Sequence, residues 1–274
     1  MPENEPLITL TTDFGYRDPF VGVMKGVILK INPRALIVDL DHGIAPQNIR
    51  DAAFSLGVSY RFFPDHTIHL VVVDPGVGSG RRAVLVSVDN HYFVGPDNGV
   101  FSYVYNFSVE EPKVVHITAS HYFLSSGSPT FQARDLFAPV AAWLSRGIGA
   151  ANFGDYVSDY QKFEVPSPRL AAEDTLLGEV IHIDGFGNAI TNIRKSDIGE
   201  LCQRASSPVM KISMGGSEAG LKEFYSQAED SGLYCLVNSS GYLEFFVNGG
   251  SASTQYNISP EDKVEIRCGR SGKG

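Results

Sequence analysis

An acid, a glycine-rich loop and two arginines follow one another in the segment HLVVVDPGVGSGRR, residues 69–82. Asp74 ends a continuous apolar run, and the loop returns Arg81 and Arg82 towards it. Ligands of open α/β sheets bind beyond the carboxyl ends of such buried strands, and glycines let the backbone approach a ligand closely. The segment predicts an acid and a cation around one small space, with Asp74 as the first active-site candidate. A tight turn with a surface salt bridge is the alternative interpretation.

The glycine pattern of this loop disfavours two phosphate-binding motifs. Glycines stand at 76, 78 and 80, whereas G-x-G-x-x-G needs its third glycine at position 81, and no Lys-Ser or Lys-Thr pair closes a P-loop. A new apolar run, residues 83–88, follows in place of a helix whose N-terminus could bind phosphate. We therefore expect neither a dinucleotide site nor a P-loop here.

Strand-like and helix-like segments alternate before this loop, which predicts a mainly parallel sheet with right-handed crossovers. Asp18 followed by Pro19 is expected to cap the first helix, which Asn32 and Pro33 end. The predicted strands are 7–12, 36–40 and 68–73, and the predicted helices are 19–31 and 48–60. Because parallel strands end at one edge, Asp13, the 39–42 cluster and Asp74 should all reach one ligand.

The next segments predict the rest of a first domain, residues 1–165. An antiparallel pair, 83–88 with 92–94, should turn at Asp89-Asn90, and a further strand is expected over 114–118. After SPTFQARD an apolar helix should run to about Leu144, with Asp135 near its N-cap and Pro139 tolerated in its first turn. Periodicity is lost between Gly147 and Asp174, where we place the domain boundary.

The remaining residues, 175–274, predict a small all-β domain, which suggests a barrel. Strand-like runs cover 176–183, 189–193, 209–214, 234–238, 242–247 and 263–267, and only 221–228 indicates a helix. Two turns carry polar and aromatic groups, DGFGN at 184–188 and NSSGYLE at 238–244. Phe186 beside Asn188 could stack on a planar base and bond to its edge; a turn with a packed ring is the alternative.

Composition limits the classes of function. The 274 residues carry a formal charge of −9 and a pI near 5.2, which disfavours binding to nucleic acid or an anionic membrane. Three cysteines, at 202, 235 and 268, with no C-x-x-C pair argue against a disulfide framework or a zinc site. No signal-like start and no apolar run of about 20 residues are present, so a cytoplasmic protein with a small-molecule ligand is expected.

Six ordered motifs together resemble the S-adenosylmethionine (SAM) hydroxide adenosyltransferases, or SAM hydrolases, and their relatives the fluorinase and chlorinase. The motifs are TTDFGYRDPFVGVMKGV, DLDHGIAPQNI, VVVDPGVGSGRR, TFQARDLFAPVAAWL, DGFGNAITNI and NSSGYLEFFVNGG. The resemblance implies an N-terminal α/β domain, a C-terminal β-barrel, SAM as substrate, and no metal or other cofactor. It also implies a homotrimer whose sites lie between one subunit's first domain and its neighbour's second.

The resemblance also assigns roles to single residues. Asp13 would bind the ribose diol, because a carboxylate can accept from two hydroxyls. Asp18 and Asp184 would face the methionine ammonium, and Phe186 and Asn188 the adenine. Further substrate contacts would come from Ser239, Glu244 and the backbone near Val247.

The implied reaction is the attack of water on the ribose C5′, which releases adenosine and methionine. The hydrolases surround this water with an aspartate, an arginine and a histidine, and the matching residues are Asp74, Arg81 and Gln132. The halogenases carry a tyrosine where Asp74 stands, and an anion repels halide, so halogenation is disfavoured. Glutamine can orient water but cannot take up its proton, which leaves a SAM- or adenosine-binding protein without turnover as the alternative function.

Overall fold

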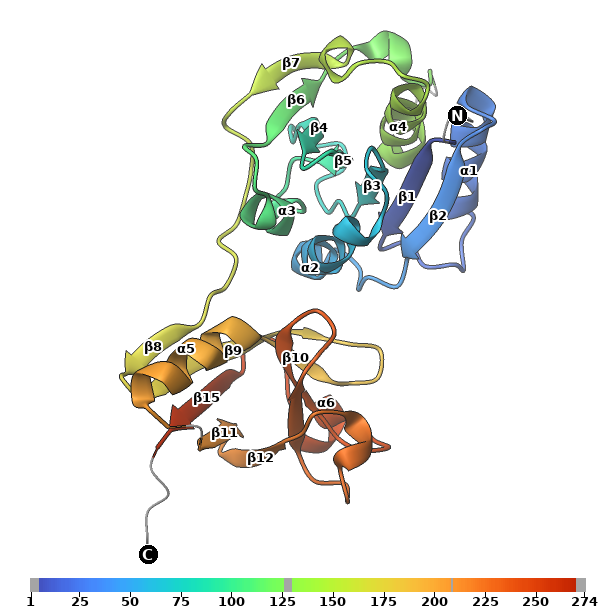
Figure 1. Ribbon diagram of the computed structural model, residues 1–274. Helices are drawn as coiled ribbons and strands as arrows, with labels where there is room; N and C mark the ends of the chain where they lie inside the picture. Colours follow the sequence, from blue (N-terminus) through green and yellow to red (C-terminus); the bar gives the residue numbers. More distant parts are fainter. Residues whose placement is uncertain (1–4, 126–129, 208, 270–274) are drawn as a thin grey trace, which may run out of the picture. The chain divides into compact units, whose positions relative to one another are not determined.

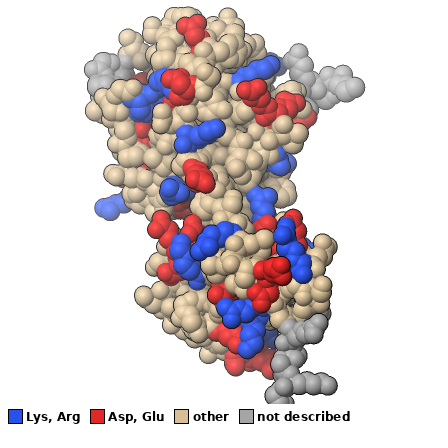
Figure 2. Space-filling view, turned by 90° about the vertical axis from the view of Figure 1, so that its left-hand side faces the viewer, with Lys and Arg blue, Asp and Glu red and all other residues tan. Residues whose placement is uncertain are grey.

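The structure, a computed structural model, describes residues 5–125, 130–207 and 209–269. The chain divides into two compact units, Met1–Val165 and Pro166–Gly274 (Figure 1). Lysine and arginine side chains are interspersed with aspartate and glutamate on the face that Figure 2 shows. Among the described residues, none of the helices combines the length and the apolar character needed to span a bilayer.

The first unit is built on one sheet with strand order β2-β1-β3-β5-β4-β6-β7. The pairs β1–β2, β1–β3 and β3–β5 are parallel, whereas β4–β5, β4–β6 and β6–β7 are antiparallel. The strands are β1 Leu7–Thr12, β2 Leu36–Asp41, β3 Ile68–Val72, β4 Ala83–Val88, β5 His91–Pro96, β6 Lys113–Ile117 and β7 Gly154–Val157. The predicted α/β class is confirmed, and its parallel half contains the strands that end in acids.

Helices cover both faces of this sheet, which explains why β3 is buried along its whole length. Helices α1 and α4 pack together on one face, and α2 and α3 pack together on the other (Figure 1). Their bounds are α1 Phe20–Ile31, α2 Ile49–Ser59, α3 Ser102–Phe107 and α4 Ala138–Ser145. Because both faces are covered, a ligand reaches these strands only at their ends, where the loops lie.

The predicted cap of helix α1 is wrong. Helix α1 starts after Pro19, which occupies the cap position without a side-chain hydrogen bond and accepts from the Val23 amide at 2.9 Å, while Asp18 is exposed. Asp135 does lie near the start of its helical segment, as predicted: it is in the first turn of the π-helix Ala133–Phe137, where it is buried and pairs with Arg134. The backbone of α1 therefore enters the helix later than the Asp18-Pro19 pattern indicated.

The predicted antiparallel hairpin at Asp89-Asn90 is confirmed. Strands β4 and β5 pair over their whole length, and the two turn residues have φ values of 47° and 60°. Positive φ at both central positions is the geometry that matches the twist of a two-residue hairpin, and Asp and Asn tolerate it well.

Two buried histidines form a polar chain in the core of the first unit. Thr9 Oγ1 lies 2.8 Å from His69 Nδ1, and His69 Nε2 lies 3.3 Å from His91 Nδ1. Burial lowers the pKa of His69 to about 3, and burial also lowers the pKa of His91. Both imidazoles are therefore neutral at pH 7, and their hydrogen bonds satisfy each other inside the sheet.

The second unit is a closed barrel, as the sequence predicts. Its strand order is β10-β14-β13-β12-β11-β15-β9-β8, and the additional pairing of β10 with β9 closes the ring and leaves β8 outside it. The strands are β8 Arg169–Ala172, β9 Thr175–Ile183, β10 Ala189–Arg194, β11 Met210–Met214, β12 Ser217–Leu221, β13 Tyr234–Val237, β14 Tyr242–Phe246 and β15 Lys263–Cys268. Helix α6, Ala252–Tyr256, lies between β14 and β15 in the sequence.

The helix expected over 221–228 is absent from the described structure of that segment. Leu221 ends β12, where it pairs with Cys235 of β13, and only a single 3-10 turn, Tyr225–Gln227, follows. The longer of the two α-helices described in this unit is instead α5, Lys195–Ala205, which buries Ile198 and Leu201 against the barrel. Ladder pairing within the closed barrel therefore overrides the local helical pattern at Leu221.

Candidate active site

A cavity of about 720 Å³ opens in the first unit where β1 and β3 end. Its polar lining includes Asp13, which follows β1, and Asp74, which follows β3, together with Gln132 just before the π-helical turn. Its wall is otherwise largely apolar, with Phe14, Phe20, Val72, Pro75, Val77 and Phe131. The carboxylates of Asp13 and Asp74 and the amide of Gln132 therefore face one cavity whose wall is largely apolar.

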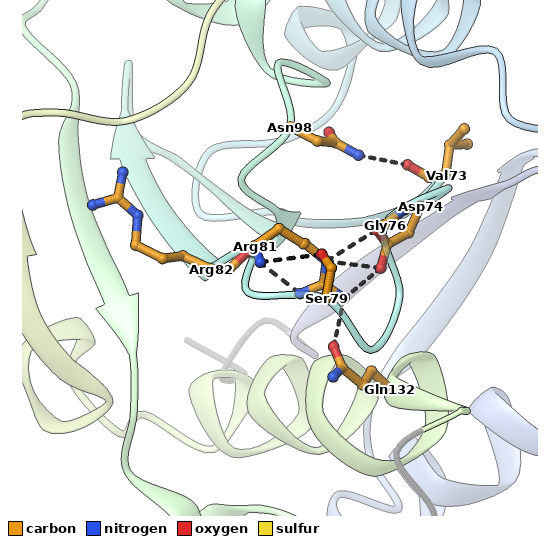
Figure 3. A network of polar contacts seen from close by, with 8 residues as sticks. All are labelled: Val73, Asp74, Gly76, Ser79, Arg81, Arg82, Asn98 and Gln132. Carbon is orange, nitrogen blue, oxygen red and sulfur yellow. Dashed lines mark hydrogen bonds and ion pairs between the residues drawn. The ribbon is translucent and has the colours of Figure 1, made fainter.

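Asp74, Arg81 and Gln132 form one connected group at this cavity (Figure 3). Arg81 Nε donates to both carboxylate oxygens of Asp74, each at 2.9 Å, and Arg81 Nη2 donates to Asp74 Oδ2 and to Gln132 Oε1. The side chains of Arg81 and Asp74 are only 10% and 5% exposed. The three residues proposed to handle water are therefore brought together, with Arg81 between the other two.

The loop after β3 is shaped around this ion pair. Asp74 Oδ1 accepts the Gly76 amide at 3.2 Å, and the Arg81 amide donates to Ser79 Oγ at 3.2 Å. Gly78 has a φ of 80°, which a side chain would strain. On its other side the Arg81 guanidinium lies 5.2 Å from the centre of the Phe137 ring. The arginine is thus held by backbone, carboxylate and ring contacts at once.

Arg82 does not return to Asp74, contrary to the sequence prediction. Its side chain points away from Arg81 (Figure 3) and donates to Asp97 Oδ2 at 2.9 Å and to Asp159 Oδ1 at 2.7 Å. Consecutive side chains leave an extended backbone on opposite sides, so only one of two adjacent arginines can face the cavity. Arg82 instead ties the glycine-rich loop to the chain around Asp159.

Asp13 is anchored by backbone at the cavity. Its Oδ2 accepts the Gln47 amide at 2.7 Å, where Gln47 has a φ of 66°. The preceding Thr12 Oγ1 lies 2.8 Å from His42 Nδ1, and the His42 carbonyl accepts the Gly15 amide at 2.9 Å. His42 therefore holds the loop on both sides of Asp13 from behind the cavity.

The 39–42 cluster does not line this cavity, and the expectation that it reaches the ligand stays a prediction. Asp39 Oδ2 accepts from Lys25 Nζ at 2.7 Å, and Asp39 Oδ1 lies 3.1 Å from His42 Nε2. Burial opposes ionisation of Asp39, but the hydrogen bonds of Lys25 and His42 outweigh it and lower the pKa of the carboxyl. The negatively charged carboxylate of Asp39 therefore holds the side chains of His42 and Lys25 in place.

The second unit has its own cavity, of about 580 Å³. Four residues proposed from the sequence line it: Asp184, Phe186, Asn188 and Val247. Sequence reasoning missed other lining residues, among them Tyr225, Phe246, Asn248 and Ser251. Phe246 and Asn248 lie within the NSSGYLEFFVNGG motif and Ser251 follows it directly, so examining the whole motif and the next residue would have found them.

The loop at 184–188 is held by its own acid. Asp184 Oδ1 accepts the amides of Phe186 at 2.9 Å and Asn188 at 2.8 Å, and Asn188 Nδ2 donates to Asp184 Oδ2 at 3.0 Å. Gly187 has a φ of 83°, and a Cβ there would lie 2.0 Å from Ser251 Oγ. The result is a tight turn that leaves the Phe186 ring 82% exposed while Asn188 is buried.

Three other predicted substrate contacts do not line either cavity. Asp18 and Ser239 are exposed on loops, and Glu244 is 3% exposed within β14. Glu244 accepts from the Tyr225 hydroxyl at 2.7 Å and from Asn238 Nδ2 at 3.0 Å. Burial and then the hydrogen bond to Glu244 raise the pKa of Tyr225, so this tyrosine stays a neutral donor. Glu244 therefore supports a lining residue of the second cavity.

Within residues 5–125, 130–207 and 209–269 there is no group of three or more His, Cys, Asp or Glu side chains that could hold a metal ion. The fold and these two cavities are typical of proteins that bind small molecules, with a paired acid and arginine at one cavity and an exposed aromatic ring at the other.

Comparison with known families specifies this class. The N-terminal domain model of the SAM hydroxide adenosyltransferases matches residues 8–154, and the C-terminal domain model matches residues 178–265. The chain belongs to the SAM hydroxide adenosyltransferase family, as the six motifs indicated.

Individual relatives agree with this assignment. The chain is 35% identical over 269 residues to the (R)-S-adenosyl-L-methionine hydrolase of Methanocaldococcus jannaschii, covering 95% of each chain. It is 32% identical over 265 residues to that of Salinispora arenicola, covering 96% of this chain and 98% of the relative. The fluorinase of Nocardia brasiliensis is more distant, at 25% identity.

A solved structure supports the fold over nearly the whole chain. The crystal structure of an uncharacterized conserved protein from Thermotoga maritima superposes with a TM-score of 0.86 at 34% identity, covering 95% of this chain and 99% of that one.

Proposed function

We propose that this protein hydrolyses SAM to adenosine and L-methionine by the attack of water on the ribose C5′. The observation that carries the proposal is the group of Asp74, Arg81 and Gln132 at the first cavity. The family assignment and the relatives named as hydrolases support it.

The reaction depends on positioning the nucleophilic water, and the leaving group needs no general acid. Methionine leaves a sulfonium as a neutral thioether, so no proton has to be supplied to it. Water is a very weak acid, so a carboxylate cannot remove its proton outright at neutral pH. Asp74 therefore acts by accepting a hydrogen bond from the water and aligning it with C5′, while Arg81 favours the hydroxide that develops. The proton that the water loses as the C–O bond forms is released to the solvent.

Gln132 completes the group as a neutral partner. Its Oε1 accepts from Arg81 Nη2, and arginine can only donate, which fixes the orientation of the amide. The Nε2 group then offers N–H donors towards the cavity. A neutral imidazole has the same pairing of one acceptor and one donor, so glutamine reproduces the hydrogen bonds of histidine without its ability to take up a proton.

The remaining predicted contacts are assigned by the chemistry of their free groups. Asp13 has one oxygen on the Gln47 amide, and we assign its other oxygen to the ribose hydroxyls. Asp184 uses three of about four lone-pair positions within its loop, which leaves one for the methionine ammonium. Phe186 stacks on adenine, and the Asn188 side-chain oxygen accepts from its edge. Val247 contacts the substrate through its backbone. Asp18, Ser239 and Glu244 support substrate binding from positions outside the two cavities.

We also propose that the chain assembles as a homotrimer whose sites are completed by a neighbouring subunit. The first cavity holds the water-handling group, whereas the aromatic and amide pair suited to adenine lines the second cavity. Light scattering should report three chains of 29.8 kDa, or about 89 kDa. A monomer that still cleaves SAM contradicts this assembly.

The second candidate function is a SAM- or adenosine-binding protein, and Gln132 is the observation that favours it. Incubation with SAM, followed by chromatography of adenosine and methionine, separates the two. Because the relatives' names specify the (R) form, the (S) and (R) sulfonium forms are assayed separately. Equal amounts of adenosine and methionine support hydrolysis; saturable SAM binding in calorimetry without either product supports the binding protein.

A further inference from the structure

Two cysteines that are distant in the sequence meet in the second unit. Cys202 lies in α5, and Cys268 is the last residue of β15. Their Sγ atoms are 3.5 Å apart, in hydrogen-bonding contact. Next to them Ser207 Oγ donates to the Gly269 carbonyl at 2.9 Å, so the end of the helix and the end of the strand are tied together. The two thiols are therefore held as neighbours by the fold.

The three cysteines of the chain differ in access. Cys202 is partly exposed, whereas Cys268 is buried and Cys235 is completely buried in the barrel core. Burial, and then the hydrogen bond to Cys202, raises the pKa of Cys268, which keeps that group a thiol at neutral pH. Burial raises the pKa of Cys235 to about 12. An oxidant in solution therefore reaches Cys202 first.

We propose that Cys202 and Cys268 are a redox modification site that closes into a reversible disulfide when a peroxide reaches the protein. Hydrogen peroxide oxidises the Cys202 thiol to a sulfenic acid and is reduced to water. The Cys268 sulfur then attacks the sulfenic sulfur, and the hydroxide that leaves takes the Cys268 proton as a second water. A dithiol reductant reverses the bond.

The disulfide would link α5 covalently to β15, the last strand of the barrel. It joins positions 66 residues apart, so it restricts the unfolded chain over much of the second unit. Neither cysteine lines the second cavity. We therefore expect greater stability with little change in SAM hydrolysis.

The test treats the full-length protein with a small excess of hydrogen peroxide and counts free thiols after denaturation. The three thiols of the wild type should fall to one. The Cys235→Ser variant is the matched control, and its two remaining thiols should both disappear. Cys202→Ser and Cys268→Ser each remove one partner and should form no intramolecular bond.

Tryptic mapping without reduction identifies the pair. The expected product links SDIGELCQR, residues 196–204, to the tripeptide CGR, residues 268–270. The melting temperature of the oxidised wild type should rise by about 5 °C or more and return after dithiothreitol. Three remaining thiols, a cross-link to Cys235, or disulfide-linked dimers on a non-reducing gel would each overturn the proposal.

Discussion

The two cavities present their functional groups in opposite ways. In the first unit, Asp74 and Arg81 are nearly buried and already bonded to each other and to Gln132. In the second unit, the Phe186 ring is exposed on the 184–188 turn, and Asp184 stabilises this turn by accepting the Phe186 amide. A group that must align a reacting water gains from being fixed beforehand, whereas a ring that stacks on a base needs an open face. Under the proposed function the first cavity carries turnover and the second carries binding, so substitutions in the two cavities should have separate effects.

The largest expected effect is on turnover through Asp74→Asn. The change keeps the shape but removes the charge that accepts from water and balances Arg81, so kcat should fall by about 10³-fold while KM changes little. Steady-state rates with SAM measure both. Asp159→Asn is the matched control, because Asp159 pairs with the neighbouring Arg82 but is exposed and outside the cavity, and its kcat should stay near wild type. Equal loss of binding and turnover in Asp74→Asn would assign this acid a structural role.

A smaller effect, on binding alone, is expected for Phe186→Ala. Loss of a stacking ring should raise KM by about 10-fold and leave kcat within about two-fold. Because the ring is exposed, the melting temperature should not change. Phe224→Ala removes another exposed ring that does not line the cavity, and it should behave as wild type. A fall in kcat with unchanged KM would contradict the assignment of substrate binding to the second cavity and turnover to the first.

The smallest effect is expected for Gln132→His. A neutral imidazole can accept from Arg81 and donate from its other nitrogen, as the amide does, so kcat at pH 8 should stay within about 10-fold of wild type. An imidazolium cannot accept that hydrogen bond and places a second positive charge beside Arg81. The variant should therefore lose activity as pH falls through roughly 6.5, whereas the wild type should not lose activity there. Initial rates against pH for both proteins check this; an inactive wild type that histidine restores would favour the binding protein.

Local patterns predicted the features of this fold that depend on local chemistry. The apolar run before Asp74, the acid after β1 and the Asp89-Asn90 hairpin were all readable because burial on both faces and positive φ restrict the residue types. Arg82 was misplaced because its partners Asp97 and Asp159 lie 15 and 77 residues away. No local pattern distinguishes which of two adjacent arginines a distant acid will bind.

Other parts could not be predicted because tertiary pairing decides them. The segment at 221–228 has a helical pattern, yet the barrel uses Leu221 as a strand residue opposite Cys235. No sequence pattern indicated that Glu244 is buried within β14 and bonded to Tyr225 and Asn238. For the same reason, the contact between Cys202 and Cys268 has no signature in the sequence around either residue.

The origin of the oxygen in the product tests the central claim most directly. The protein is incubated with SAM in water enriched in ¹⁸O, and adenosine and methionine are analysed by mass spectrometry. If the first cavity aligns water with C5′, adenosine should carry one ¹⁸O in its 5′-hydroxyl and methionine none. Unlabelled adenosine, or methylthioadenosine with labelled homoserine in place of these products, would contradict attack of water at C5′.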